Sequence, residues 1–128
     1  MQEIFYARAF KKHGVERTPV YQFCYLIGSL SDSPRRCMDP VDYVYGVLGM
    51  LQIKIPRMID PKKVWQRFLS ELDDYMDMAG FKNEVVQEPD GSKVKIIGIR
   101  KCAYEIDLTT VKCMGGIYHY ILRVEDVE

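Results

Sequence analysis

The stretch Asp60–Gly80, DPKKVWQRFLSELDDYMDMAG, is the clearest structural signal in the chain. Its Asp-Pro start is typical of a helix N-terminus, because the aspartate oxygens accept hydrogen bonds from free N–H groups and proline loses none at the first helical position. Gly80 is suited to end the helix, since glycine adopts the left-handed conformation. Apolar side chains recur every three or four residues and form one stripe: Val64, Trp65, Phe68, Leu69, Leu72, Tyr75, Met76 and Ala79. The pattern predicts an amphipathic helix that buries Trp65 between helices.

Two further helices are predicted upstream, from Thr18 to about Leu30 and from Asp39 to about Leu51. Each begins, like the helix predicted from Asp60, with an oxygen-bearing side chain followed by proline. Gly46 lies inside the second helix and costs roughly 1 kcal/mol relative to alanine. We therefore expect a close helix crossing at Gly46 that offsets this cost.

A short amphipathic helix is also predicted over residues 2–12, and His13-Gly14 would end it. The apolar members of this segment are Ile4, Phe5, Ala7 and Phe10.

The pattern changes from helical to alternating after Phe81. Val85-Val86 and residues 94–99 flank the turn sequence Pro89-Asp90-Gly91-Ser92, which predicts a hairpin. Apolar side chains alternate with polar ones over residues 104–108, and again over residues 118–124 after the Gly115-Gly116 turn. The sequence therefore predicts three or four antiparallel strands that pack one face on the helices.

These expectations combine into one α+β domain over residues 1–128, because a chain of this length has room for a single core. A bundle of three to four helices occupies residues 1–80, and the β-hairpins of residues 82–125 form a small C-terminal antiparallel sheet of three to four strands. Apolar residues make up 48% of the chain, which is enough to fill that core.

The charge balance argues against a nucleic-acid partner or an anionic membrane, because 18 basic and 18 acidic residues leave a net charge of zero. No stretch reaches the ~18 to 20 apolar residues of a membrane span, and the first residues lack the apolar run of a signal peptide. We expect a cytoplasmic protein, and these features are compatible with the nucleus as well.

The four cysteines are scattered, so we expect four free thiols, no metal site and no cofactor. They are Cys24, Cys37, Cys102 and Cys113.

No catalytic or phosphate-binding motif is present in the sequence. A Cys113–His119 pair is the one arrangement that suggests a nucleophile, although His119 alternates with core-type tyrosines and fits a solvated strand face better. Basic residues near the helix starts suit a phosphate or an acidic partner, and their default role is solubility: Arg35, Arg36, Arg57, Lys62 and Lys63. The residues selected as candidate binding residues are Arg35, Arg36, Asp42, Tyr118, His119 and Tyr120.

The segment Arg36–Met50, RCMDPVDYVYGVLGM, resembles a motif of fungal heterokaryon-incompatibility (HET) domain proteins. In that family an arginine precedes Asp-Pro-Arg-Asp, an aliphatic residue, a tyrosine and a run that ends in Leu-Gly. The resemblance covers about residues 30–80. Val41 stands where the family has its second basic residue, and the upstream family signature Tyr-x-Ala-Leu-Ser-Tyr-x-Trp-Gly has no counterpart. The resemblance implies a role in fungal self/non-self recognition or cell-death signalling.

The favoured interpretation is a non-enzymatic protein-interaction module. The alternative is a small-ligand-binding protein or enzyme with a pocket between helices and sheet, and a nucleic-acid or phosphate binder is a third interpretation. A cavity lined by the last two strands would favour the ligand, and a partner surface there would favour binding to a protein.

A homodimer is expected through the C-terminal β region. If the helices cover only one side of the sheet, the other face should be polar. Ile121 falls on that other face, beside His119 and Arg123. An apolar side chain there, on an exposed edge strand, is open to pairing with a second copy of the chain. The competing expectation is that residues 1–17 fold back over that face within one chain.

Overall fold

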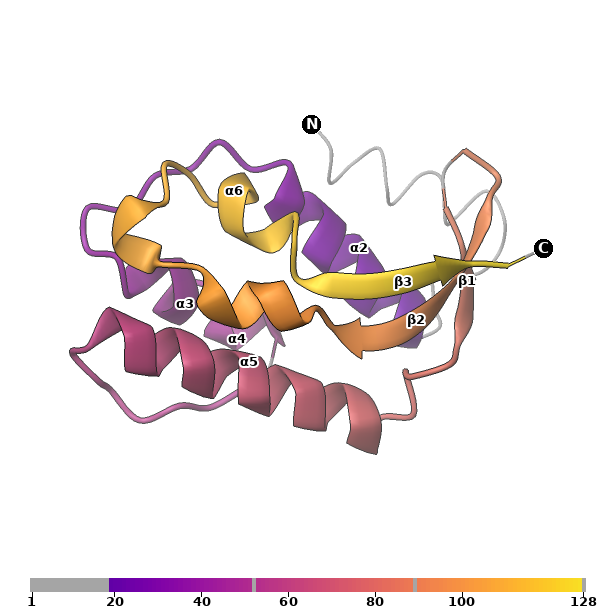
Figure 1. Ribbon diagram of the computed structural model, residues 1–128, viewed down its shortest axis with the longest axis horizontal. Helices are drawn as coiled ribbons and strands as arrows, with labels where there is room; N and C mark the ends of the chain where they lie inside the picture. The colour runs from indigo at the N-terminus through magenta and orange to yellow at the C-terminus, as the bar shows by residue number, and fades with distance from the viewer. Residues whose placement is uncertain (1–18, 52, 89, 128) are drawn as a thin grey trace.

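The computed structural model describes residues 19–51, 53–88 and 90–127 (Figure 1). It is an α+β structure, as predicted, with most of its helices before a small antiparallel sheet. The helices of the first part are α2 (Pro19–Ser31), α3 (Asp42–Tyr45), α4 (Leu48–Leu51) and α5 (Pro61–Met78). The predicted helix over residues 2–12 lies outside the described residues.

The sheet has three strands in the order β1-β2-β3, and both neighbouring pairs are antiparallel. The strands are β1 (Val85–Gln87), β2 (Lys93–Ile99) and β3 (Leu122–Asp126). The hairpin of β1 and β2 was predicted, and Gly91 in its turn has a positive φ of 93°. Two 3₁₀ helices, η1 (Lys101–Glu105) and η2 (Leu108–Thr110), and the short helix α6 (Gly115–Tyr118) connect β2 to β3.

Helix α5 confirms the prediction from its stripe. The Asp60 side chain caps it by accepting a hydrogen bond from the Lys62 backbone N–H at 3.0 Å, and Gly80 follows its end with φ of 75°. The stripe members that are buried are Val64, Trp65, Phe68, Leu69, Leu72 and Met76. The apolar period of this helix therefore faces the core along almost its whole length.

The single helix predicted over residues 39–51 is wrong, because the structure has two one-turn helices, α3 and α4, in its place. The first turn is tight: Asp42 N–H donates to the carbonyl of Asp39, three residues back. Gly46 ends α3, and a β-carbon there would lie 2.8 Å from the carbonyl oxygen of Asp42. The close approach at Gly46 thus involves its own preceding turn and not the helix crossing that we expected.

The predicted helix bundle is also not clear in the structure. Helix α2 packs on α6, whereas α5 packs on β2, η1, η2 and α3 (Figure 1). Because α3 and α4 are single turns, two long helices remain, and each packs mainly on C-terminal elements.

The strand predicted over residues 104–108 is wrong, since this segment forms parts of η1 and η2. Asp107 accepts hydrogen bonds from the Thr109 backbone N–H at 2.9 Å and from its hydroxyl at 2.7 Å, which caps η2. The alternation of half-buried or buried residues with exposed ones is nevertheless real between Tyr104 and Leu108. Two successive 3₁₀ turns produce here the alternation that usually indicates a strand.

The Gly115-Gly116 pair opens helix α6 and does not form the predicted turn, so β3 begins only at Leu122. Gly115 lies against the end of α2, where its N–H donates to the carbonyl of Ser33 at 2.9 Å. Ile121, predicted on an exposed strand face, is buried between α6 and β3. The dimer prediction therefore loses the residue on which it chiefly rested.

Candidate functional site

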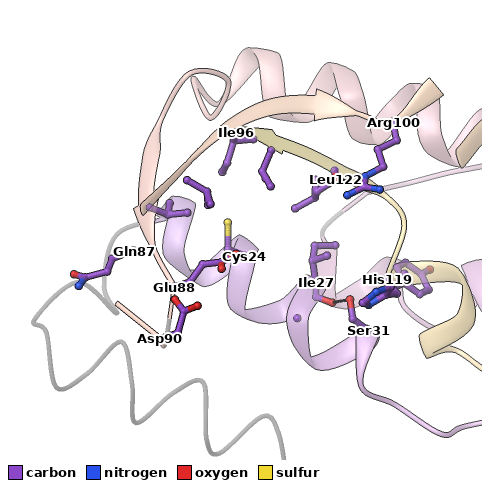
Figure 2. Close-up of a pocket in the computed structure, with 15 residues that line it drawn as sticks. Cys24, Ile27, Ser31, Gln87, Glu88, Asp90, Ile96, Arg100, His119 and Leu122 are labelled. Atoms are coloured by element: carbon purple, nitrogen blue, oxygen red, sulfur yellow. Dashed lines mark hydrogen bonds between the residues drawn. The ribbon is translucent and has the colours of Figure 1, made fainter. Parts of the chain in front are cut away.

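A cleft of about 430 Å³ lies between α2 and the sheet (Figure 2). One wall is formed by α2 residues spaced three or four apart, which places them on one face of that helix: Cys24, Ile27, Gly28 and Ser31. The opposite wall is formed by apolar side chains of all three strands: Val86, Val94, Ile96, Leu122 and Val124. The middle of the cleft is therefore mostly apolar, with one thiol in it.

The two ends of the cleft carry opposite charges (Figure 2). Arg100 and His119 lie at the end near Ser31, which is the C-terminal end of α2. Glu88 and Asp90 lie at the other end, in the β1–β2 turn region. A ligand with an apolar body and charged ends would match this distribution.

Backbone contacts hold the basic end in place. The Arg100 side chain donates from Nε to the Leu122 carbonyl at 2.8 Å, and its backbone N–H donates to the Ile121 carbonyl at 2.8 Å. Both contacts tie the end of β2 to the segment that joins α6 to β3. His119 directly follows α6, and its ring meets the Tyr120 ring edge to face at 5.0 Å.

The acidic end is held by the hairpin and by α2. The Gln87 backbone N–H donates to the Tyr21 hydroxyl oxygen at 2.8 Å, which joins β1 to the first turns of α2. Asp90 accepts hydrogen bonds from the Ser92 hydroxyl at 2.6 Å and from its backbone N–H at 2.9 Å. These bonds lower the pKa of Asp90, so its carboxylate is ionised at neutral pH.

Cys24 lies in the cleft, and it does not have the properties of a nucleophile. Burial, followed by the nearby charge of Glu88, raises the pKa of its thiol from 9.0 to about 12. The thiol is therefore protonated at neutral pH, and a protonated thiol is a poor nucleophile and metal ligand. All four cysteines are free, as predicted. Within the described ranges, no group of three or more His, Cys, Asp and Glu side chains is placed to hold a metal ion.

Two of the candidate residues chosen from the sequence, Tyr118 and His119, line the cleft. Tyr118 is buried, and its hydroxyl donates to the Tyr43 carbonyl at 2.7 Å. Burial raises the pKa of Tyr118, so this residue acts as a neutral part of the core that borders the cleft. His119 is exposed and remains accessible to a ligand.

The other candidates lie elsewhere. Arg36 donates from Nε to the Lys112 carbonyl at 2.8 Å, and the backbone of the adjacent Arg35 accepts from the Met114 N–H at 2.7 Å. Both residues therefore belong to the loop after α2 that contacts the segment before α6. Tyr120 is half-exposed and lines a separate surface hollow.

Asp42 lies at the start of α3, where a carboxylate oxygen is 3.9 Å from the guanidinium of Arg57. Arg57 also stacks over the ring of Tyr45 at 4.4 Å. The six candidates thus do not form a single site. The cleft does not bring Cys113 and His119 together either, because His119 lines it and Cys113 does not.

Sequence reasoning missed the charged ends and the thiol of the cleft, namely Glu88, Asp90, Arg100 and Cys24. Asp90 was recognised only as part of the turn sequence Pro89-Asp90-Gly91-Ser92, and neither Glu88 nor Arg100 was singled out. Their common feature is the cleft itself, which brings together residues 24, 88 and 100 from separate elements. No local pattern in the sequence encodes that proximity.

No family model, curated protein or solved structure matches this chain. Among the helices in the described part of the chain, none is long and apolar enough to cross a bilayer.

Proposed function

We propose that this chain is a non-enzymatic protein-interaction module whose cleft between α2 and the sheet binds an apolar peptide segment with charged ends. The observation that carries the proposal is the arrangement of the cleft. Its walls are apolar, Arg100 and His119 lie at one end, and Glu88 and Asp90 lie at the other. Opposite charges at two ends would orient a bound segment, because the reversed orientation places like charges together.

A helix is a suitable shape for the bound segment. Grooves that accept an amphipathic helix bind its apolar face through side chains spaced three or four residues apart. The wall formed by α2 presents side chains with that same spacing. The hydrogen-bonded sheet opposite it gives a firm second wall.

The biological setting of the module is proposed from the sequence resemblance. Arg36–Met50 resembles a motif of HET-domain proteins, and we place the module in a fungal self/non-self recognition or cell-death pathway on that ground. In the structure, Arg36 ties its loop to Lys112, and Tyr43 and Val44 are buried in α3. These contacts favour a structural role for the motif within the module.

The binding proposal can be tested with a short synthetic helical peptide that has an acidic N-terminus, a Leu- and Phe-rich centre and two C-terminal lysines. We expect the amide NMR signals of cleft residues to shift on titration into the full chain. Val124→Glu places a charge on the cleft wall and should weaken binding, by about tenfold or more. Val85→Glu is the matched control, since Val85 is a similarly exposed strand valine that does not line the cleft. Equal affinities for both variants would contradict the proposal.

A small apolar ligand with an anionic head group is the second candidate. The cleft volume of about 430 Å³ lies within the range of roughly 300–1,000 Å³ typical of small-molecule sites. Inward-facing side chains of β2 and β3 line this cleft, which is the arrangement that we expected of a ligand binder. Dodecanoate is a suitable probe: tight binding of dodecanoate together with no binding of the peptide would favour this candidate over the protein-interaction module.

A further inference from the structure

Arg100 is a cation at the basic end of the cleft whose side chain is oriented by a hydrogen bond. Its Nε donates to the carbonyl of Leu122, the first residue of β3, at 2.8 Å. This bond leaves the edge formed by Nη1 and Nη2, which can pair with both oxygens of a carboxylate. Over residues 19–51, 53–88 and 90–127, no Asp or Glu carboxylate lies within ion-pair distance of Arg100. The exposed guanidinium therefore keeps an edge for the carboxylate of a ligand.

His119 is the second cation donor at this end, and the two side chains come from different elements. Arg100 follows β2 and His119 follows α6 (Figure 2). A neutral imidazole donates one N–H, whereas an arginine is always charged and donates in parallel pairs. Arg100 is therefore better suited than His119 to distinguish a carboxylate from a neutral group.

The charges also fix the direction of a bound helix relative to α2. The Tyr21 hydroxyl, in the first turns of α2, accepts a hydrogen bond from the Gln87 N–H, so α2 begins near the acidic end of the cleft. A bound helix with its acidic first turn at Arg100 and its basic last turn at Glu88 and Asp90 therefore runs antiparallel to α2. This order of charges also stabilises the bound helix itself, because acidic residues favour its N-terminus and basic residues its C-terminus.

The length of the α2 wall sets the spacing of those charges. Cys24 and Ser31, which line this wall, are seven residues apart, or about 10 Å along the helix axis. A helix that spans the same wall has about two turns between its acidic and its basic residue. The side chains of those two turns would face the apolar walls.

We propose that Arg100 is the specificity-determining residue of the cleft, and that its guanidinium pairs with a carboxylate in the first turn of a partner protein's helix that runs antiparallel to α2. The inference rests on the proposed function and names the partner: an amphipathic helix with an acidic first turn and a basic residue about two turns later. Arg100 also lies near the C-terminal end of α2, where a cation stabilises a helix. Substitutions of Arg100 can therefore lower stability, so the test compares ligands as well as proteins.

Two versions of the synthetic helical peptide, with glutamate or glutamine in the first turn, test the role of Arg100. Calorimetric titration of the full chain should give about tenfold tighter binding of the glutamate peptide. Arg100→Gln should bind both peptides about equally. Arg100→Lys should retain only part of the preference, because lysine keeps the charge without the paired donors. A loss of stability alone would weaken both peptides equally and would leave the preference in place.

Lys101→Gln is the matched control, since Lys101 is an exposed neighbour that carries the same charge and does not line the cleft. It should keep the tenfold preference. A preference that survives in Arg100→Gln, or that is absent from the parent, would overturn the role of Arg100. The proposed interaction function would still stand in that case, because the peptide binds.

A nitroxide spin label at one end of the glutamate peptide tests the direction. A label at the peptide N-terminus should broaden the amide NMR signals of His119 and Tyr120. A label at its C-terminus should broaden those of Gly91 and Ser92, in the β1–β2 turn. The opposite pattern, or equal broadening at both ends, would overturn the antiparallel direction.

Dodecanoate and dodecanol separate this inference from the proposed function if neither peptide binds. A preference of about tenfold for dodecanoate that Arg100→Gln removes would support recognition of a carboxylate by Arg100. The partner helix and the interaction function would then be overturned in favour of a small ligand. If neither dodecanoate nor the peptides bind, both the role of Arg100 and the interaction function fail.

Discussion

Individual side chains connect parts of this chain that are remote in sequence, and Trp65 is the main example. Its ring is fully buried, its indole N–H donates to the Ala103 carbonyl at 2.6 Å, and it meets the Tyr118 ring edge to face at 6.4 Å. One residue of α5 thereby joins η1 and α6. Tertiary contacts also determine the properties of two other residues. Gly115 packs closely against the backbone at the end of α2, and the thiol of Cys24 is buried.

Replacing Trp65 by alanine should lower the free energy of unfolding by about 3–5 kcal/mol, because it leaves a large cavity and an unpaired Ala103 carbonyl. Trp65→Phe keeps most of the ring volume and loses the hydrogen bond, so its cost should be smaller, about 1–3 kcal/mol. Denaturant unfolding measures both values. A Trp65→Ala variant that unfolds at the parent's denaturant concentration would contradict the contacts described here.

Gly115→Ala should destabilise the protein by about 1–3 kcal/mol, because the new methyl group would collide with the Ser31 carbonyl oxygen and approach that of Ser33 to 3.1 Å. Both neighbours are backbone atoms, so neither can rotate away. Gly116→Ala is the matched control, since its methyl group would be 4.0 Å from the nearest atom, Cys113 Sγ. Thermal unfolding of the two variants should separate them clearly, and equal midpoints would argue against the tight α2–α6 contact.

The raised pKa of Cys24 predicts slow alkylation and a specific pH dependence. In the folded protein at mildly alkaline pH, iodoacetamide should modify exposed Cys102 well before Cys24. Because the folded pKa of about 12 exceeds the ordinary value of 9.0, the contribution of this thiol to stability is complete below pH 9 and is lost as the pH rises toward 12. The stability of a Cys24→Ala variant should therefore fall less steeply over that interval, and parallel pH profiles would contradict the assignment.

At the scale of elements, local signals decide where long helices begin but do not decide how short segments fold. α5 carries a cap, a proline, a continuous stripe and a terminal glycine, and it forms as predicted. The segments 39–51 and 101–121 also carry apolar patterns, but they fold into short α and 3₁₀ helices that contact α5 or α2. Short elements gain little from propensity, so tertiary contacts choose among their conformations.

Asp60→Ala should cost about 1 kcal/mol in the free energy of unfolding, because the Lys62 N–H at the start of α5 loses its acceptor. Asp60→Asn retains a capping oxygen and should be nearly neutral. The difference between the two variants, measured by denaturant unfolding, isolates the cap from the loss of charge. No difference would show that the cap does not contribute to the stability of α5.

For the whole molecule, the cleft and the sheet edges are the two features on which the proposed interactions rest. β1 and β3 are the two outer strands, and Val85 and Val124 are exposed on them. With Ile121 buried, the homodimer stays a prediction that rests on these two edges.

Sedimentation of the full chain over micromolar concentrations tests the homodimer. Pairing of β3 edges should give a mass that doubles with rising concentration. Val124→Pro, which removes a backbone donor and fits poorly in a paired strand, should restore the monomer. A strict monomer throughout would end the dimer proposal.

The sequence by itself determined the α+β class with a small C-terminal antiparallel sheet, together with α2, α5 and the β1–β2 hairpin. Each of these elements is specified by capping residues, apolar period or turn residues close together in the chain. It also determined that Trp65 is buried and that the thiols are free. Only the tertiary structure decided the break at Gly46, the 3₁₀ path between β2 and β3, the burial of Ile121, and the cleft with charged ends. These features depend on which surfaces α2 and α5 present to a chain segment tens of residues away, and contacts at that separation leave no period or motif in the local sequence.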